Sequence, residues 1–272
     1  MRHALALGAV FCLAAVPAAL AAPSPFQANC AALHVVGDPR SANGARWTYA
    51  SVDDGVAYAL EGAVFAPTTP GPYAGVVLSH GKNGSPYGYS SSVGRIMRGW
   101  GMVVIATMYS HAPAADDAGN LPVGTDGASA GNILRARKAR GLLSCFRGVT
   151  PARLAAHGNS MGAFVTGELL GRYPEDFRAA SQTSGGVSDG PITTHPDAAA
   201  QIVTPFQIHH SEADATVPIA FADRLVSILA GNQVTYDYRV AEYPGYSHGQ
   251  MGQDPAMLDR VREWYLEHSV LP

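Results

Sequence analysis

The sequence predicts an α/β fold, in which helices cover both faces of a mostly parallel sheet. Short, continuous apolar runs alternate along most of the chain with stretches that have helical spacing, and this is the pattern of buried parallel strands joined by helices. The composition agrees, since 47% of the 272 residues are hydrophobic and 14% are charged. This apolar content is too high for a disordered chain, and 30 Gly and 19 Pro are too many for a coiled coil or another fibrous fold.

The charge balance excludes one class of partner. Eighteen basic residues stand against 21 acidic ones, for a net charge of -3. A chain without basic excess has little to neutralise phosphates with, so nucleic acid is not an expected partner. The oligomeric state cannot be derived from this composition.

The N-terminus has the pattern of a secretory signal. A positive start at Arg2 and His3 precedes an uncharged apolar run at 4–20, which ends in an Ala-Leu-Ala site of the small-x-small kind. We predict a signal peptide at 1–21 and a single α/β domain at 22–272, secreted or periplasmic and without stable membrane insertion after cleavage. An uncleaved membrane anchor is the alternative, because the run is close to the shortest spanning length.

The number of cysteines in the mature chain depends on removal of that signal peptide. Cys12 is removed with it, so Cys30 and Cys145 can form one bridge in an oxidising compartment. Two unpaired buried thiols are the alternative.

The first predicted strand, 56–65, alternates apolar with small or polar residues, as a half-buried antiparallel strand does. A Pro-rich stretch at 67–72 ends it. The runs 74–78 and 102–106 are continuously apolar and predict parallel strands covered on both faces. Between them, 91–100 has the spacing of a helix.

The same alternation predicts the remaining elements. In chain order they are a helix at 128–143, a strand at 153–157, a helix at 163–173, strands at 179–184 and 204–210, a helix at 219–229, a strand at 234–242 and a helix at 254–267. The long polar loops 111–126 and 185–201 are the expected places for a pocket wall.

The pattern G-x-S-x-G, which marks a nucleophile elbow between a strand and a helix, occurs four times. Its central serines are Ser129, Ser160, Ser188 and Ser247. Only Ser160 has a predicted strand directly before it and a predicted helix directly after it. We therefore predict Ser160 as the nucleophile, with Ser129 as the main alternative because a helix also follows it.

A serine nucleophile needs a general base and a carboxylate that orients the base. Asp214 lies on the loop after the predicted strand 204–210, and His248 lies just after the last predicted strand. We predict these two as acid and base. Glu212 is the alternative acid, and His195 is a weaker candidate for the base.

The tetrahedral intermediate of acyl transfer also needs N–H donors for its oxyanion. The backbone N–H of Met161, directly after the nucleophile, is one expected donor. The Gly-rich loop 80–84 follows the first buried strand, and Lys82 is the expected source of the second N–H.

Three tyrosines near that loop and the next strand end, Tyr87, Tyr89 and Tyr109, are candidates for substrate binding, although exposed loop tyrosines are an equal alternative. No spacing of ligand residues requires a metal. His209 and His210 are adjacent on a predicted strand, so they face opposite sides and are interpreted as satisfied structural histidines.

Four short motifs occur in this order along the chain: His80-Gly81, Gly158-x-Ser160-x-Gly162, Asp214-x-x-Val217-Pro218 and Tyr246-Ser247-His248-Gly249. Over about residues 55–268 they resemble the α/β-hydrolase superfamily and, within it, the dienelactone-hydrolase-like branch. The resemblance implies the α/β-hydrolase fold and a serine esterase that forms an acyl-enzyme without a cofactor. Dienelactone hydrolases proper carry cysteine at the elbow, whereas this chain has a serine there. The resemblance therefore does not imply specificity for lactones.

The expected substrate is therefore a small-molecule or polymer ester. The same three residues also serve peptide or amide cleavage and acyl transfer to an acceptor other than water. The alternative outside the enzymes is a protein with the same fold that binds a ligand without catalysis.

Overall fold

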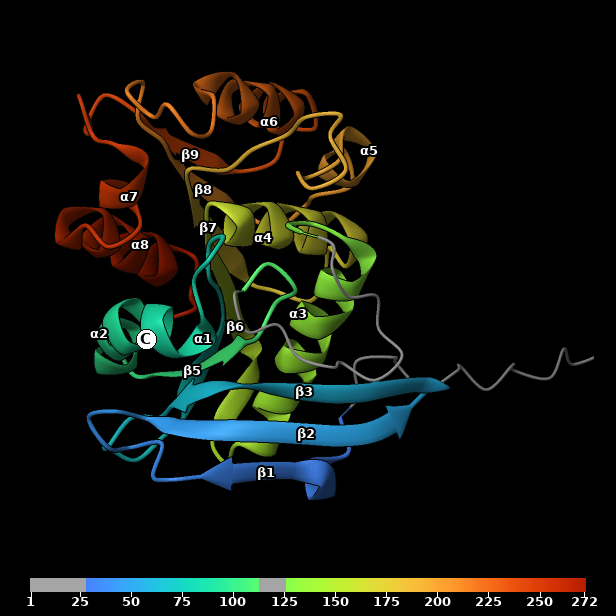
Figure 1. The fold of residues 1–272 in the computed structure, drawn as a ribbon. Helices are drawn as coiled ribbons and strands as arrows, with labels where there is room; N and C mark the ends of the chain where they lie inside the picture. Colours follow the sequence, from blue (N-terminus) through green and yellow to red (C-terminus); the bar gives the residue numbers. More distant parts are fainter. Residues whose placement is uncertain (1–27, 113–125) are drawn as a thin grey trace, which may run out of the picture.

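The structure of the chain, a computed structural model, describes residues 28–112 and 126–272. The predicted signal peptide and most of the loop 111–126 lie outside these residues. Within the described part, nine strands form one sheet in the order β1-β2-β3-β5-β4-β6-β7-β8-β9 (Figure 1). The strands are β1 (Leu33–Val36), β2 (Ala45–Asp53), β3 (Val56–Phe65), β4 (Tyr73–Ser79), β5 (Met102–Thr107), β6 (Val149–Asn159), β7 (Ala179–Thr183), β8 (Phe206–His209) and β9 (Tyr236–Arg239).

The sheet is mostly parallel, as predicted. From β5 through β4, β6, β7 and β8 to β9, every neighbouring pair is parallel. The three strands β1, β2 and β3 are antiparallel and join the sheet through an antiparallel pairing of β3 with β5. The carboxyl ends of the parallel strands therefore meet at one edge, where α/β proteins build their sites.

Helices cover both faces of the sheet (Figure 1). Their bounds are α1 (Pro86–Tyr89), α2 (Arg95–Gly99), α3 (Ala130–Leu142), α4 (Met161–Arg172), α5 (Pro196–Ala199), α6 (Ile219–Gly231), α7 (His248–Met251) and α8 (Pro255–Glu267). Helices α3, α4 and α6 bury their apolar sides on one face, and α2 and α8 pack on the other. Within β4, Val77 belongs to the first core, whereas Val76 and Leu78 belong to the second. This is the period-two alternation of a strand buried on both faces.

Several predicted boundaries differ from the structure. The expected helix 91–100 is a series of short pieces, with the π-helical turn Ser90–Gly94 between α1 and α2. Strand β9 is shorter than the predicted 234–242, and β6 is longer than the predicted 153–157. Element ends depend on hydrogen-bond partners from elsewhere in the chain, which a local pattern does not reveal.

The sequence pattern missed strands β1 and β2. Strand β2 does carry a signal, because Ala45, Trp47 and Tyr49 are buried and the residues between them are exposed. The indole nitrogen of Trp47 donates to the carbonyls of Ala63 and Ala106, at 3.1 and 3.2 Å, and so ties β2 to β3 and β5. A buried indole with both acceptors in neighbouring strands makes β2 part of the core.

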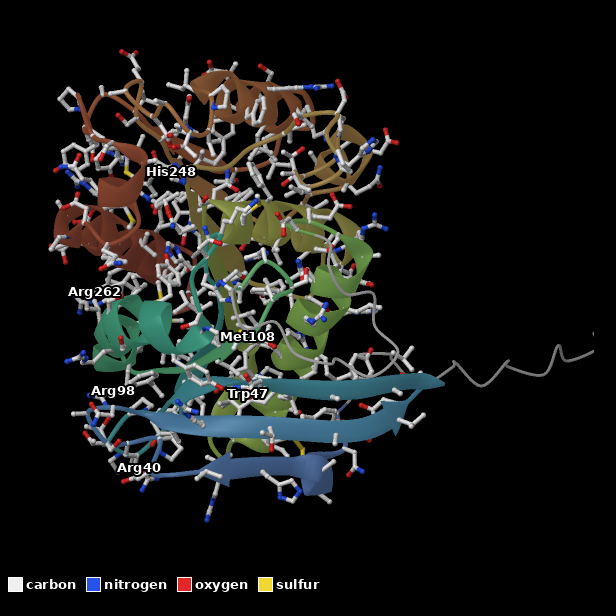
Figure 2. The ribbon with its side chains drawn as sticks, in the orientation of Figure 1. Arg40, Trp47, Arg98, Met108, His248 and Arg262 are labelled. Carbon is white, nitrogen blue, oxygen red and sulfur yellow. A yellow bond between two sulfur atoms is a disulfide. The ribbon has the colours of Figure 1, made fainter. Side chains whose placement is uncertain are left out.

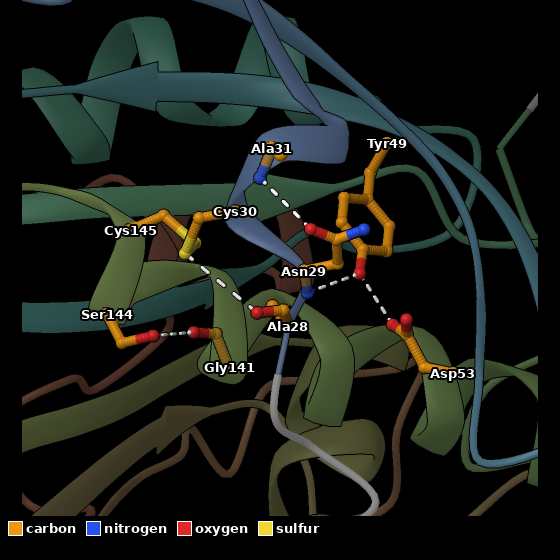
Figure 3. Close-up of a disulfide and its surroundings, with 9 residues drawn as sticks. All are labelled: Ala28, Asn29, Cys30, Ala31, Tyr49, Asp53, Gly141, Ser144 and Cys145. Atoms are coloured by element: carbon orange, nitrogen blue, oxygen red, sulfur yellow. Dashed lines mark hydrogen bonds between the residues drawn. A yellow bond between two sulfur atoms is a disulfide. The ribbon is translucent and has the colours of Figure 1, made fainter.

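A disulfide joins Cys30 to Cys145, with 5.3 Å between their Cα atoms, and this confirms the bridge over the alternative of two free thiols. It links the turn before β1 to the segment that follows α3 (Figure 3). Beside the disulfide, the backbone N–H of Asn29 donates to the Tyr49 hydroxyl at 2.9 Å, and that hydroxyl donates to the Asp53 carboxylate at 2.5 Å. The N-terminal segment is thus held both covalently and by hydrogen bonds.

A search for membrane-crossing segments covered residues 28–112 and 126–272. In these two stretches, every helix is too short or too polar to span a bilayer.

Candidate active site

Ser160 occupies a sharp turn between β6 and α4. Its backbone φ is +57°, a strained value for a residue with a Cβ, and Met161 begins the helix directly afterwards. A Cβ on Gly158 would lie 2.1 Å from the Gly162 carbonyl oxygen, and one on Gly162 would lie 2.1 Å from the Ser79 carbonyl oxygen. Both glycines are therefore required by close backbone contacts, which is the arrangement expected of a nucleophile elbow.

The other three serines with this pattern sit in ordinary backbone. Ser129 is the N-cap of α3 with φ of -58°, and Ser247 is the N-cap of α7 with φ of -71°. Ser188 lies in a loop, where its hydroxyl contacts that of Thr193 at 2.8 Å. The structure corrects one detail, because a helix does begin after Ser247. This helix has only four residues, too few for a periodic signal.

Three predicted residues from separate segments come together at the carboxyl edge of the sheet. His248 Nε2 lies 2.8 Å from Ser160 Oγ, and His248 Nδ1 lies 2.8 Å from Asp214 Oδ2. Because the carboxylate accepts, Nδ1 carries the proton and Nε2 accepts from the serine hydroxyl. His248 is the first residue of α7, on the side of the molecule where α8 packs (Figure 2).

Asp214 is held as a buried, hydrogen-bonded carboxylate. Its side chain has no exposed surface, and its Oδ1 accepts from the backbone N–H groups of Thr216 and Val217, both at 2.9 Å. Burial by itself raises the pKa of Asp214, but the hydrogen bonds from His248 and the two amides outweigh it and hold the pKa below its ordinary value. Asp214 is therefore ionised and able to orient the imidazole.

The alternative residues lie elsewhere. Glu212 is exposed to solvent, and His195 caps α5 with half of its side chain exposed. His209 and His210 are both buried on β8 and its end. His209 donates to Gln207 and accepts from Tyr243, whereas His210 donates from Nε2 to the Val217 carbonyl at 3.0 Å. The latter bond helps to hold the loop that carries Asp214.

The loop after β4 lies directly against the elbow. A Cβ on Gly81 would be 3.2 Å from the Ser160 Cβ, so this loop passes beside the serine. Within the described residues, the backbone N–H groups of Lys82 and Met161 have no hydrogen-bond acceptor. The expected oxyanion donors, Lys82 and Met161, directly follow Gly81 and Ser160, the two residues that approach each other here. The Lys82 side chain pairs with Asp126 at 2.9 Å and is 54% exposed.

A pocket of about 370 Å³ opens beside this loop. Most of its wall is polar or glycine, and its lining residues are His80, Gly81, Lys82, Asn83, Gly84, Ser85, Gly88, Tyr89, Asn159 and Gln253. Asn159 and Gln253 were not predicted, and their proximity follows from the packing of Gly252 against the Asn159 side chain. Only long-range packing could have revealed them.

The three tyrosines have different environments. Tyr89 lines the pocket beside the loop, and its hydroxyl lies 3.1 Å from His157 Nε2. Tyr87 lines a separate pocket of about 390 Å³, where Arg46 stacks on its ring at 4.4 Å. Tyr109 is fully buried, and its hydroxyl lies 2.8 Å from that of Ser79; a contact of Tyr109 with substrate stays a prediction. Its ring belongs to the apolar core that α3, α4 and α6 cover.

An apolar cluster adjoins the elbow as well. Met161 and Phe164 of α4 pack with Ala128 and Val217, and Ile192 from the predicted wall loop 185–201 packs against them. Among the described residues, no group of three or more His, Cys, Asp or Glu side chains could hold a metal ion.

Comparisons with known proteins give structural relatives only. No protein-family model matches the chain, and no curated protein does. An S-formylglutathione hydrolase from Agrobacterium tumefaciens superposes with a TM-score of 0.63 at 14% identity, covering 86% of this chain and 99% of its own. Esterase 2 of Thermogutta terrifontis superposes with a TM-score of 0.62 at 17% identity, covering 83% and 95%.

Dipeptidyl peptidase 4 of Porphyromonas gingivalis is also similar, with a TM-score of 0.63 at 13% identity. The match covers 81% of this chain but only 35% of the peptidase. Together with the sheet order, these similarities confirm the predicted α/β-hydrolase fold. The narrower resemblance to the dienelactone-hydrolase-like branch stays a prediction.

Proposed function

We propose that this protein is a serine hydrolase that cleaves carboxylic esters through an acyl-enzyme. The observation that carries the proposal is the continuous chain of two 2.8 Å hydrogen bonds from Ser160 through His248 to Asp214. The strained elbow and the two unpaired amides beside it support the same chemistry. Two esterase-type enzymes among the structural relatives share the fold over most of their length.

In the first half of the reaction, Ser160 Oγ attacks the ester carbonyl carbon while His248 Nε2 takes the hydroxyl proton. The carbonyl oxygen becomes an oxyanion that the N–H groups of Met161 and Lys82 stabilise. The bond to the alcohol oxygen then breaks, and His248 returns the proton to that oxygen. Asp214 stays ionised throughout and stabilises the imidazolium.

In the second half, water attacks the acyl-enzyme and gives its proton to His248. The tetrahedral intermediate collapses, the bond to Ser160 Oγ breaks, and the proton returns to the serine. The products are a carboxylic acid and the regenerated enzyme.

The test is Ser160→Ala, assayed on p-nitrophenyl acetate, with Ser188→Ala as the matched control from a decoy pattern. We expect Ser160→Ala to lose on the order of 10⁴-fold in kcat and to escape labelling by a fluorophosphonate probe. Ser188→Ala should keep both properties. A folded Ser160→Ala protein with wild-type activity would overturn the proposal.

Peptide cleavage is a second candidate, since a dipeptidyl peptidase is among the structural relatives. Acyl transfer uses the same residues. Assaying a matched ester and amide, with and without an added alcohol, separates these activities. A wild-type protein that no fluorophosphonate labels would instead indicate a non-catalytic binding protein.

We also propose that the protein acts outside the reducing cytosol. The disulfide between Cys30 and Cys145 supports this location, because such bridges persist in oxidising compartments.

A further inference from the structure

The backbone N–H of Lys82 lies in the loop 79–85, and this loop has little regular structure that could hold the N–H in place. It leaves β4 and reaches α1, with a single internal backbone bond from the Gly84 N–H to the Gly81 carbonyl, at 3.0 Å. Oxyanion stabilisation depends on a donor that is already aimed before reaction. Something outside the loop must therefore set the direction of the Lys82 N–H.

His111 contacts this loop at both sides of Lys82. Its ring Nε2 lies 3.0 Å from the His80 carbonyl oxygen, and its own backbone carbonyl accepts from the Asn83 N–H at 3.1 Å. A carbonyl oxygen only accepts, so His111 Nε2 carries the proton. One residue thus clamps the segment 80–83 at both ends and leaves the Lys82 N–H between them without an acceptor among the described residues.

His111 is itself fixed by its surroundings. It is 4% exposed, and its ring stacks on that of Tyr109 with centroids 5.3 Å apart. On the ring's other nitrogen, Asn132 Nδ2 lies 3.5 Å from His111 Nδ1, which suits the tautomer with the proton on Nε2. Asn132 is oriented in turn, since its Oδ1 accepts from the Ser110 N–H at 3.0 Å.

We propose that His111 is a positioning residue that aims the Lys82 N–H at the oxyanion. This inference rests on the proposed esterase function. His111 does not line the pocket beside the loop, and it acts through the backbone of the loop. Burial lowers the pKa of His111 to about 4, so the imidazole is neutral near pH 7 and keeps the single proton that the clamp uses.

Two amide substitutions separate this role from simple packing. The side-chain nitrogen of glutamine falls near the position of a histidine Nε2, whereas that of asparagine falls near Nδ1. We therefore expect His111→Gln to keep kcat on p-nitrophenyl acetate within about threefold, and His111→Asn to lose on the order of 10- to 100-fold in kcat with little change in KM. Inhibition by phenylboronic acid, which forms a tetrahedral anion on a serine, should weaken in parallel with kcat/KM.

Melting temperatures of both variants show whether they are folded. Equal kcat losses in His111→Gln and His111→Asn, or a wild-type kcat in His111→Asn, would overturn the inference while the esterase function stands. A wild-type protein without activity that depends on Ser160 would overturn the esterase function itself, and this inference with it.

Discussion

The disulfide between Cys30 and Cys145 should supply a large part of the stability of this protein. It closes a loop of 115 positions in the unfolded chain. In the chain-entropy model, a loop of this length costs the unfolded state about 16 cal/mol/K, or about 5 kcal/mol at 25 °C. Engineered and native bridges often deliver less, so we expect about 3 to 5 kcal/mol here.

The perturbation is the double variant Cys30→Ser/Cys145→Ser. Its native structure should persist, because the Asn29 amide still bonds to Tyr49 and β1 still pairs with β2. Activity should also persist, since Cys145 comes before β6 and Ser160 directly follows it, and β6 runs alongside all seven residues of β4, a length of about 23 Å.

The assay is urea unfolding of both proteins followed by circular dichroism, with and without dithiothreitol. We expect a lower midpoint in the double variant, a matching shift in the reduced wild type, and no effect of the reductant on the double variant. Equal midpoints in the wild type and the double variant would refute the entropic argument. A large fall in kcat would refute the separation of the bridge from the site.

Two further predictions concern the elbow and the buried histidines. In Gly162→Ala, the new Cβ would stand 2.1 Å from the Ser79 carbonyl oxygen and 2.7 Å from that of His80, so the loop after β4 must move. We expect a loss of at least about tenfold in kcat and about 2 kcal/mol in stability, and wild-type kinetics would contradict the close contact. Burial lowers the pKa of His157 to about 3 in the folded protein, below the value near 6.5 in the unfolded chain. The contribution of neutral His157 to the free energy of unfolding is therefore complete above pH 6.5 and is lost as the pH falls toward 3. Unfolding free energies measured from pH 7 to pH 4 should therefore fall less steeply in His157→Gln, by up to about 1.4 kcal/mol per pH unit, and equal slopes would contradict this.

The nucleophile elbow illustrates how far a local pattern reaches. Four serines share the same spacing of glycines, and the flanking strand and helix signals were enough to select Ser160. What distinguishes it physically is the positive φ of its backbone and the contact of Gly162 with the preceding loop. The second property is not written in five residues, because it depends on β4 lying beside β6.

The strands also show which features a local pattern can predict. Strands β4 and β5 were predictable because a continuous apolar run reports burial on both faces. The alternation of buried and exposed residues in β2 is equally local, although β2 was not among the predicted strands. The end of β9 depends on its partner β8, so the predicted strand ran too long.

The sequence by itself therefore determined the alternation of strands and helices from β3 onward, the mostly parallel sheet, and the identity and order of the three residues that meet at its edge. These follow from side-chain periodicity and from spacing along the chain. Only the tertiary structure decided that Tyr109 is buried, that Asn159 and Gln253 border the pocket, and that His111 clamps the loop around Lys82. These relations join residues that are distant in sequence, and such contacts exist only once the helices and strands have packed.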